Sequence, residues 1–374
     1  TIFLSFVLVM SFSTTASAQL FTEDFNYTAL DSLTLHSWLI SSGGTTNAVR
    51  DTSPGLTFTG YASSGIGNAV SIFTTGQDVY RTFPKDSGNT VYSAFMINVR
   101  TAQATGDYFY ALSPAESQTN YYGRLFIKSS GAGFLFGISK SNETAVYGTT
   151  VFSFGTTYLA VIKYKFDAAK DSNDIITVYA LPPASALTSE PLTAEIVDTA
   201  ITRADAKNFG YVTLRQGSAT AAPALIMDGI RIDTTWIGAI LGTKTYSVGT
   251  ANVPGEQGHF ASLKAAFDSL SHGFAFTGNY TFYITSDITE AEVGGIGIGL
   301  ACDPSPYTVT FKPYTGVSPT ITLQYPSDGN SGPSGACFIG LNGAAMAWAD
   351  IKTTKNIIID GSNTAGGTTR DLTF

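Results

Sequence analysis

The chain has 374 residues, of which 44% are hydrophobic and 13% aromatic, whereas only 13% are charged. This length suits two domains with sizeable cores, and the composition argues against extensive disorder. The net charge of −8 argues against a nucleic-acid partner, because phosphates attract clustered Lys and Arg. Low charge, 38 glycines and abundant Thr, Ser, Tyr and Phe are typical of β-rich extracellular proteins.

Residues 1–18 have the features of a secretory signal peptide. An apolar run from Ile2 to Met10 is followed by small polar residues and by an Ala-Ser-Ala cleavage pattern that ends at Ala18. The run is shorter than the roughly 20 residues that a bilayer needs. We therefore expect a mature chain that begins at Gln19, has no membrane span, and is extracellular or on the cell surface.

Residues 19–240 are predicted to form a β-sandwich. Strand-sized apolar or alternating runs recur at intervals of about 10 to 15 residues, and no convincing helix separates them. The clearest runs are TVYSAFMINVR (90–100), GDYFYALSP (106–114), GRLFIKSS (123–130), TTYLAVIKYKF (156–166), DIITVYALPP (174–183) and ALIMDGIRI (224–232). In the run that ends at residue 166, alternation predicts a core face and a partly solvated face. The predicted core face carries Tyr158, Ala160, Ile162, Tyr164 and Phe166.

An acidic loop follows, from Asp167 to Asp174. Its residues Asp171, Asn173 and Asp174 have side chains of the kind that bind calcium. The loop lacks the Gly and the final Glu of an EF-hand, so a plain turn is the favoured interpretation.

The order of several segments resembles bacterial concanavalin A-like lectin/glucanase modules. The segments include LFTEDFNY (20–27), FGISKS (136–141), the strand that ends at Phe166, and MDGIRIDTTW (227–236). Such modules are jelly-roll sandwiches of large secreted proteins, notably of Bacteroidetes-type organisms. The resemblance spans about Leu20 to Trp236 and implies a polysaccharide or a cell-surface glycan as the partner.

Catalysis by this part of the chain is disfavoured. Glucanases on this fold carry an E-x-D-x-x-E strand, whose spacing places two carboxylates on one face. No such strand is present: Glu190, Glu195 and Asp198 fall in a Pro-flanked stretch expected to be irregular, and Glu290 and Glu292 lie outside the module. Binding is therefore favoured over hydrolysis.

Four residues are candidates for glycan contact. Tyr108 and Tyr110 are expected to share one strand face, and Tyr122 and Arg124 follow after a short loop. Aromatic rings of this kind stack on sugars beside polar side chains. Core packing or cross-strand pairing is the alternative and the favoured one, because Tyr is common throughout the chain.

Two carboxylates are candidates for a structural calcium site. Alternation places Glu23 on the face of Phe21, and Asp228 on the face of Ile226 and Ile230. A carboxylate on an apolar face needs a cation or dense hydrogen bonding. Modules of the resembled type often hold a structural calcium near their neighbouring first and last strands, so the resemblance implies that this pair shares one. A salt bridge or contacts to backbone amides are the alternative.

The second half begins with the only strong helical pattern of the mature chain. After a Gly-rich joint, HFASLKAAFDSLSHG (259–273) has apolar residues at helical spacing, with Gly273 at the C-cap position. Those apolar residues are Phe260, Leu263, Phe267 and Leu270. The runs that follow are again strand-like.

Residues 241–374 resemble the start of a right-handed parallel β-helix of the pectin-lyase-like type. The resemblance rests on the order of YSVGT (246–250), the helix, several strands and NIIIDGSN (356–363), and it implies an N-terminal cap followed by the first rungs. The chain stops 11 residues after Asn363, and no initiator Met precedes Thr1, so the sequence has the features of a fragment at both ends.

Cys302 and Cys337 are the two cysteines of the chain. In a secreted protein a disulfide between them is favoured slightly over two buried thiols. Together these features predict a mainly β, exported, non-catalytic module for glycan binding or adhesion, carried on a β-helix stalk. The alternatives are the targeting module of a polysaccharide lyase or hydrolase and a purely structural surface protein.

Overall fold

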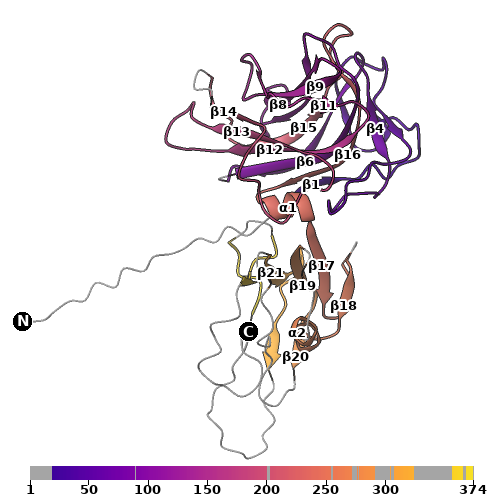
Figure 1. Ribbon diagram of the computed structural model, residues 1–374. Helices are drawn as coiled ribbons and strands as arrows, with labels where there is room; N and C mark the ends of the chain where they lie inside the picture. Colours follow the sequence, from indigo (N-terminus) through magenta and orange to yellow (C-terminus); the bar gives the residue numbers. More distant parts are fainter. Residues whose placement is uncertain are drawn as a thin grey trace, which may run out of the picture.

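The computed structural model describes residues 19–88, 90–199, 203–253, 256–271, 276, 278–290, 304, 307–323, 356–364 and 368–373. The first part of the chain is an antiparallel β-sandwich and the second part contains parallel strands (Figure 1). The expectation of a mainly β chain with an antiparallel sandwich is confirmed. The predicted signal peptide and the predicted Cys302–Cys337 disulfide lie outside the described residues.

Sheet A is the first sheet of the sandwich, and its neighbouring strands are antiparallel. Its order in space is β14 (Ile196–Asp198), β13 (Ile175–Leu181), β12 (Thr157–Lys165), β6 (Thr90–Thr101), β16 (Ala224–Asp233), β4 (Ala69–Ile72) and β3 (Arg50–Thr52). Strand β1 (Gln19–Glu23) also pairs with β16, so the first and last strands of the sandwich are neighbours. Because β14 is a strand, the expectation of irregular structure around Asp198 is wrong.

Sheet B is the second sheet and is likewise antiparallel. Its order is β10 (Val146–Tyr147), β9 (Gly133–Ser139), β8 (Tyr122–Ser130), β7 (Asp107–Ser113), β15 (Phe209–Leu214), β5 (Asp78–Asp86) and β2 (Leu39–Ser42). Strand β11 (Phe152–Ser153) also pairs with β9, and a short 3-10 helix, η1 (Leu33–Leu35), precedes β2.

The inner faces of the two sheets enclose one apolar core. Residues with large aromatic side chains lie entirely inside it, namely Phe95, Phe109, Tyr110, Phe134, Phe136, Tyr164 and Phe209. The predicted core face of β12 is confirmed at Tyr158, Ala160, Ile162 and Tyr164. On its other face Leu159 and Val161 are also buried, whereas Lys163 is half-buried and Lys165 is exposed, so the expected partial solvation of that face is confirmed.

Leu159 and Val161 are buried because a short helix covers their part of that face. Helix α1 (Trp236–Leu241) was expected to be part of a Gly-rich joint, but the Thr235 side chain accepts a hydrogen bond from Gly238 N and caps it. The Trp236 ring packs edge-on against Tyr179 at 5.4 Å, and its Nε1 donates to the carbonyl of Leu187 at 2.9 Å. Helix α1 lies between sheet A and the second part of the chain (Figure 1).

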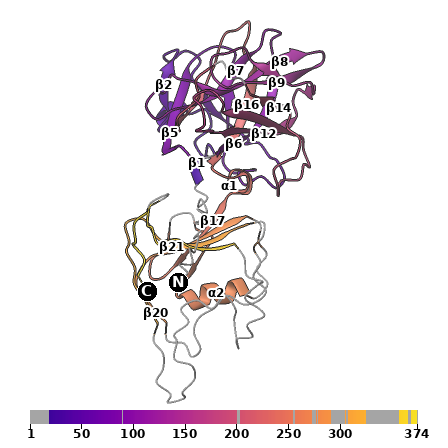
Figure 2. The same ribbon diagram turned by 90° about the vertical axis from the view of Figure 1, so that its left-hand side faces the viewer.

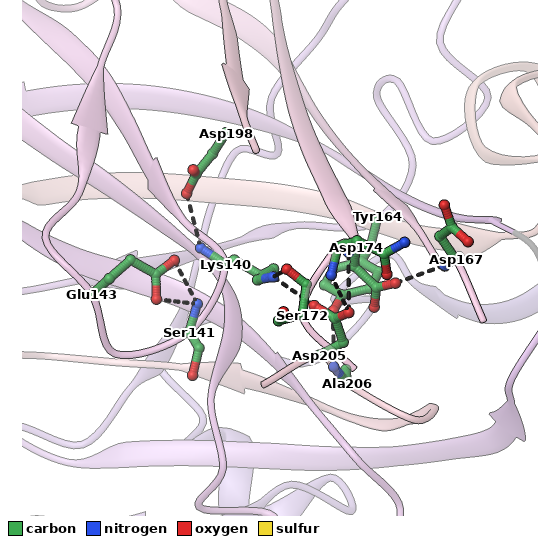
Figure 3. A network of polar contacts seen from close by, with 11 residues as sticks. Lys140, Ser141, Glu143, Tyr164, Asp167, Ser172, Asp174, Asp198, Asp205 and Ala206 are labelled. Atoms are coloured by element: carbon green, nitrogen blue, oxygen red, sulfur yellow. Dashed lines mark hydrogen bonds and ion pairs between the residues drawn. The ribbon is translucent and has the colours of Figure 1, made fainter. Parts of the chain in front are cut away.

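At one edge of the sandwich, a completely buried lysine connects the two sheets (Figure 3). Lys140 follows β9 of sheet B, and its Nζ donates to Asp205 Oδ1 at 2.5 Å and to the carbonyl of Ser172 at 3.0 Å. Its backbone N–H donates to Asp198, at the end of β14 in sheet A, at 3.2 Å. The ammonium group supplies the positive charge that these carboxylates need at this depth.

The acidic loop from Asp167 to Asp174 is fixed by the same network. Asp205 Oδ2 accepts hydrogen bonds from the backbone N–H groups of Asn173 at 2.6 Å and Asp174 at 3.1 Å. Asp174 Oδ1 in turn accepts one from Asp167 N at 2.7 Å, and burial raises the pKa of Asp174. The loop is a turn, and the cation beside it is the ammonium group of Lys140.

The second part contains two sheets of parallel strands. Sheet C has the order β18 (Gly258–Phe260), β17 (Thr243–Val248), β19 (Asn279–Ile284), β21 (Val309–Pro313) and β23 (Ile357–Ile359). Sheet D consists of β20 (Ile288–Glu290) and β22 (Ile321–Leu323). The chain alternates between them, because β19 leads to β20 and β21 leads to β22. Each of these two passages therefore adds one strand to sheet C and one to sheet D.

Equivalent side chains of successive strands stack in the core of this part. Phe282 stacks on Tyr246 at 5.1 Å and on Phe311 at 4.7 Å, with interplanar angles of 14° and 20°. Helix α2 (Leu263–Ser271) lies beside sheet C (Figure 2) and places Phe267 edge-on against Phe311 at 4.9 Å.

The predicted helix is therefore present, but it is shorter than expected. Phe260 lies in β18 and not in the helix, whereas Leu263, Phe267 and Leu270 are buried in the core as expected. Glu290 of β20 accepts a hydrogen bond from Leu263 N at 2.6 Å, so its carboxylate lies at the N-terminal end of α2.

Replacing Lys140 by methionine is expected to destabilise the sandwich by about 3–5 kcal/mol, because Asp205 would keep a buried charge without its partner. Denaturant unfolding of the full chain would measure the loss. The double variant K140M/D205N removes both charges and is expected to be more stable than K140M. Equal stability of K140M and the wild type would show that the ion pair does not stabilise the sandwich.

Candidate functional site

The outer face of sheet B carries a group of partly exposed aromatic and basic side chains. The outer face of sheet A, by contrast, is covered by α1 and by the loop that contains Leu187. The group on sheet B is called the aromatic–basic face below and consists of Tyr108, Tyr121, Arg124, Phe126, Lys128, Tyr147 and Arg215.

Tyr108 of β7 lies between two arginines on this face. The guanidinium carbon of Arg215 lies 4.1 Å from the centre of the Tyr108 ring, and that of Arg124 lies 5.2 Å from it. Arg215 also forms an ion pair with Asp107 at 2.8 Å and donates to the carbonyl of Tyr108 at 3.2 Å. Burial raises the pKa of Tyr108 above its ordinary value despite the two cations, so the phenol is neutral near pH 7.

The rest of the face extends the aromatic surface along β8. Phe126 lies 5.4 Å from the Tyr108 ring and 6.4 Å from Tyr147 of β10. Lys128 places its ammonium group 3.9 Å from the centre of the Tyr147 ring. Gly137 of β9 lies under that ring, where a Cβ atom would come within 2.6 Å of ring carbons. A side chain larger than hydrogen at this position would displace Tyr147.

Tyr121 closes the face on the side of β2. Its ring lies 5.9 Å from Tyr108, and its hydroxyl is 3.1 Å from the hydroxyl of Ser41. The rings of the face therefore touch one another, and the hydrogen bond and cation contacts fix their orientation before any ligand binds.

The structure brings two of the four predicted contact residues together and separates the others. Tyr108 and Arg124 are neighbours on the aromatic–basic face. Tyr110 is fully buried in the core, where its hydroxyl is 2.6 Å from that of Ser93, so the expectation that it shares a face with Tyr108 is wrong. A break in the β7–β8 register between Tyr108 and Tyr110 is the reason, since one extra residue reverses the alternation.

Tyr122 is likewise on the core side of its strand. Its ring packs 6.4 Å from Phe209 of the core, whereas Arg124, two residues later, is on the outer face. Between them Gly123 adopts φ 56°, and the register with β7 shifts there. Without this irregularity, Tyr122 and Arg124 would lie on the same face.

The sequence reasoning missed Phe126, Lys128, Tyr147 and Arg215. A signal existed for the first two, because strict alternation in RLFIK places them on the face of Arg124. Tyr147 lies on strand β10, and Arg215 directly follows strand β15. Nothing local in the sequence connects either residue with Tyr108.

Glu23 does not have the free oxygens that a calcium ligand needs. Its Oε1 accepts from Phe25 N at 2.9 Å, and its Oε2 accepts from Tyr27 and Trp38 and forms an ion pair with Arg81. Arg81 is on β5 of sheet B, so this pair crosses the sandwich and is the salt-bridge alternative.

Asp228 lies on the opposite face of sheet A from Glu23, which corrects the expectation that the two share an ion. Glu23 pairs with Ile230 of the inner core, but the register of β16 shifts between Asp228 and Arg231, at Gly229. Asp228 therefore points outward, where its Oδ2 accepts a hydrogen bond from Leu56 N at 2.7 Å.

Oxygen atoms of several residues lie near Asp228, together with the backbone N–H groups of Leu56 and Gly229. Its buried Oδ1 and the Oδ1 of nearby Asp24 have no hydrogen-bond partner. A Cβ atom on Gly55 would meet Asp228 Oδ2 at 3.0 Å and the carbonyls of Gly67 and Asn68 at 2.9 and 3.2 Å. Burial, with repulsion from Asp24 as a further cause, raises the pKa of Asp228 to about 8.

These oxygens fit a calcium ion, which binds carboxylates and backbone carbonyls. Within the described ranges, no three His, Cys, Asp or Glu side chains are grouped as metal ligands, so carbonyl oxygens would have to complete the coordination. We propose that Asp228, with Asp24 in place of Glu23, holds a structural calcium.

No protein-family model matches the chain. No curated protein matches it either. Solved structures that are similar include an alginate lyase in complex with an alginate tetrasaccharide, at 12% identity over 58% of this chain and 96% of that chain, with a TM-score of 0.37. An endo-β-1,4-glucuronan lyase from the fungus Trichoderma reesei matches at 9% identity over 60% and 99%, with a TM-score of 0.37. Domain 4 of an extracellular arabinanase from Geobacillus stearothermophilus matches at 9% over 58% and 93%, with a TM-score of 0.34.

At such identities and TM-scores, the function of this chain has to be inferred from its own residues. No helix within the described ranges is both long and apolar enough to cross a membrane.

Calcium is expected to raise the melting temperature of the full chain at pH 8, and chelator to lower it. In chelator, the contribution of Asp228 to the free energy of unfolding should be fully present below about pH 4 and lost as pH rises through about 8, because the folded state holds the Asp228 proton more tightly than the unfolded state. Calcium at about 100 times its dissociation constant would add about 2.7 kcal/mol. Calorimetry at about pH 4 and at pH 8, with calcium and with chelator, would measure both the calcium effect and the pH effect.

Asp228→Asn should remove both the calcium response and this part of the pH dependence. Asp167→Asn, which neutralises an exposed carboxylate, is the matched control and should retain both. If calcium and chelator give the same melting curve at pH 8, Asp228 holds no cation.

Proposed function

We propose that the chain is a glycan-binding module and that the aromatic–basic face of sheet B is its binding surface. The observation that carries this proposal is the packing of Tyr108, which remains partly exposed although two arginines and Phe126 fix its orientation. Sugar rings present apolar C–H faces and polar edges. Rigid aromatic rings with adjacent guanidinium donors complement both, and little side-chain entropy is lost on binding.

The arrangement of the carboxylates in the sandwich fits glycan binding better than glycan hydrolysis. Hydrolysis of a glycosidic bond requires two facing carboxyl groups. Within the described part of the aromatic–basic face, Asp107 is ion-paired with Arg215 and forms no such pair. Glu190 binds Tyr92 and Lys163 on the other sheet, and Asp198 belongs to the Lys140 network.

We further propose that the second part is the beginning of a β-helix that serves as a stalk in an exported protein. Parallel in-register pairing occurs in both of its sheets, and Thr320 and Thr373 extend the pairing beyond β22. Stacked Tyr246, Phe282 and Phe311 form the continuous interior that a coil requires. Cleavage before Gln19 would leave the sandwich whole, because β1 begins at that residue.

Tyr108→Ala is expected to weaken glycan binding by about tenfold or more, since a central aromatic anchor typically contributes over 1.4 kcal/mol. Affinity electrophoresis of the full chain in gels that contain xylan or polygalacturonate would measure the change. Tyr314→Ala, a partly exposed tyrosine in the second part, is the matched control and should bind as the wild type does. Binding that is unaffected by Tyr108→Ala, or no binding to either polysaccharide, would contradict the proposal.

The proposed β-helix can be tested by introducing pairs of cysteines and measuring disulfide formation, in a chain in which Cys302 and Cys337 are replaced by serine. Thr281 and Thr310 are opposite each other in sheet C, and Thr289 and Thr322 are opposite each other in sheet D. Cysteines at such positions are close enough to form disulfides. Under mild oxidation, we expect a disulfide to form in the T281C/T310C variant and in the T289C/T322C variant. We expect none in T281C/T322C, because its two cysteines lie in different sheets. If a disulfide forms in only one of the two sheets, the result would contradict a β-helix in which both sheets are parallel.

A further inference from the structure

The aromatic–basic face contains two positive charges, on Arg124 and Lys128, that form no ion pair among the described residues. Arg124 donates from Nε to the Ser139 hydroxyl and from Nη2 to the carbonyl of Glu143, both at 2.9 Å and both to neutral acceptors. Among the described residues, no carboxylate lies within ion-pair distance of Arg124 or Lys128. Cations without a counter-charge are notable in a chain with a net charge of −8.

Two of the cations also repel each other. Arg124 and Arg215 lie over the same Tyr108 ring, at 5.2 and 4.1 Å. Asp107 forms its ion pair with Arg215, and the Glu143 carboxylate accepts hydrogen bonds from the backbone N of Ser141. Both carboxylates favour the charged form of Arg124, but only from beyond ion-pair distance. Partial burial of the Arg124 guanidinium without a carboxylate partner costs folding free energy. Such a local cost is typical of sites where a ligand supplies the missing charge.

The cations are spread along the face and not gathered at one point. Arg124 and Lys128 are four residues apart on β8, which corresponds to roughly 13 Å along an extended strand. A single small anion cannot contact both. The ligand that satisfies them carries negative groups at intervals along an extended chain, and it has ring faces that stack on Tyr108, Phe126 and Tyr147.

We infer that this face selects acidic polysaccharides whose sugars carry carboxylates, that is, polyuronates. The inference rests on the proposed glycan-binding function and specifies its ligand class. The planar fork of Arg124 matches a carboxylate in two parallel hydrogen bonds. Lys128 provides a point charge for the carboxylate of a sugar farther along the chain, and Tyr108 and Phe126 stack on the rings between them.

The test compares polygalacturonate with the same polymer after methyl esterification, which removes the charge and keeps the sugar chain. The full chain is expected to bind the acid form at least about tenfold more tightly, because a hydrogen bond to a carboxylate is stronger than one to a neutral ester. The preference should weaken as salt is raised. Calorimetric titration or affinity electrophoresis would measure both effects.

Arg124→Gln and Lys128→Gln are each expected to reduce affinity for the acid form more than affinity for the ester, so that the ratio of the two affinities falls toward one. Lys85→Gln is the matched control, since it removes one positive charge from an exposed ion pair with Glu116, away from this face. Equal binding of acid and ester would overturn the inference and leave glycan binding standing. Binding of neither polymer would overturn both.

Dextran sulfate separates carboxylates from anions in general. If it binds as tightly as polygalacturonate does, and Arg124→Gln weakens both equally, then the face recognises polyanions without regard to carboxylates, and the assignment to uronates is wrong. Weaker binding of dextran sulfate at the same salt concentration supports the inference.

Discussion

The contact between helix α1 and the outer face of sheet A determines how the rest of the molecule is arranged. A sheet in a two-layer sandwich uses one face for the shared core, and its other face either is covered or meets solvent. On sheet A, Trp236 inserts between Tyr92 and Tyr179, and Leu159 and Val161 are buried beneath the cover. This contact connects the sandwich to the strands that follow α1, and it leaves sheet B as the sheet whose outer face holds partly exposed rings.

Alternation along a strand predicted the core well, but three irregularities decided the site. The inner residues of β12 are where the period-two pattern places them, because that strand pairs with β6 and β13 without a break. The β7–β8 register is broken at Tyr108 and again near Gly123, and β16 is broken at Gly229. Each break reversed the predicted face of a candidate residue, namely Tyr110, Tyr122 and Asp228. A bulge depends on the partner strand, and one sequence read by itself does not reveal that partner.

Buried charges separate the structural sites of the sandwich from the functional one. The carboxylate of Asp205 has Lys140, and that of Glu23 has Arg81, so each pair is complete within the fold, and the Glu23–Arg81 pair links the two sheets. Asp228 and Arg124 differ, because their ionisable groups are partly or wholly buried and have no ionic partner among the described residues. The sequence composition alone did not distinguish these cases, since all four are ordinary charged residues in strands or adjoining loops. The ionic partners of each group in the folded structure distinguish these cases. Within the described ranges, an anionic partner is missing at Arg124 on sheet B, and a cationic partner is missing at Asp228 on β16.

These two deficits act on different properties of the same sandwich. A cation at Asp228 would hold β16 to the loop around Gly55 and Gly67 and so contribute to stability, on the outer side of sheet A. An anion at Arg124 would bind on sheet B, across the full thickness of the core, and so contribute to recognition. Because interiors are close-packed, a rigid sandwich keeps Tyr108, Phe126 and Tyr147 aligned even when no ligand is bound. The stability of the frame is therefore a condition for recognition: loosening the core would allow the rings to reorient, and the entropy saved by their fixed arrangement would be lost.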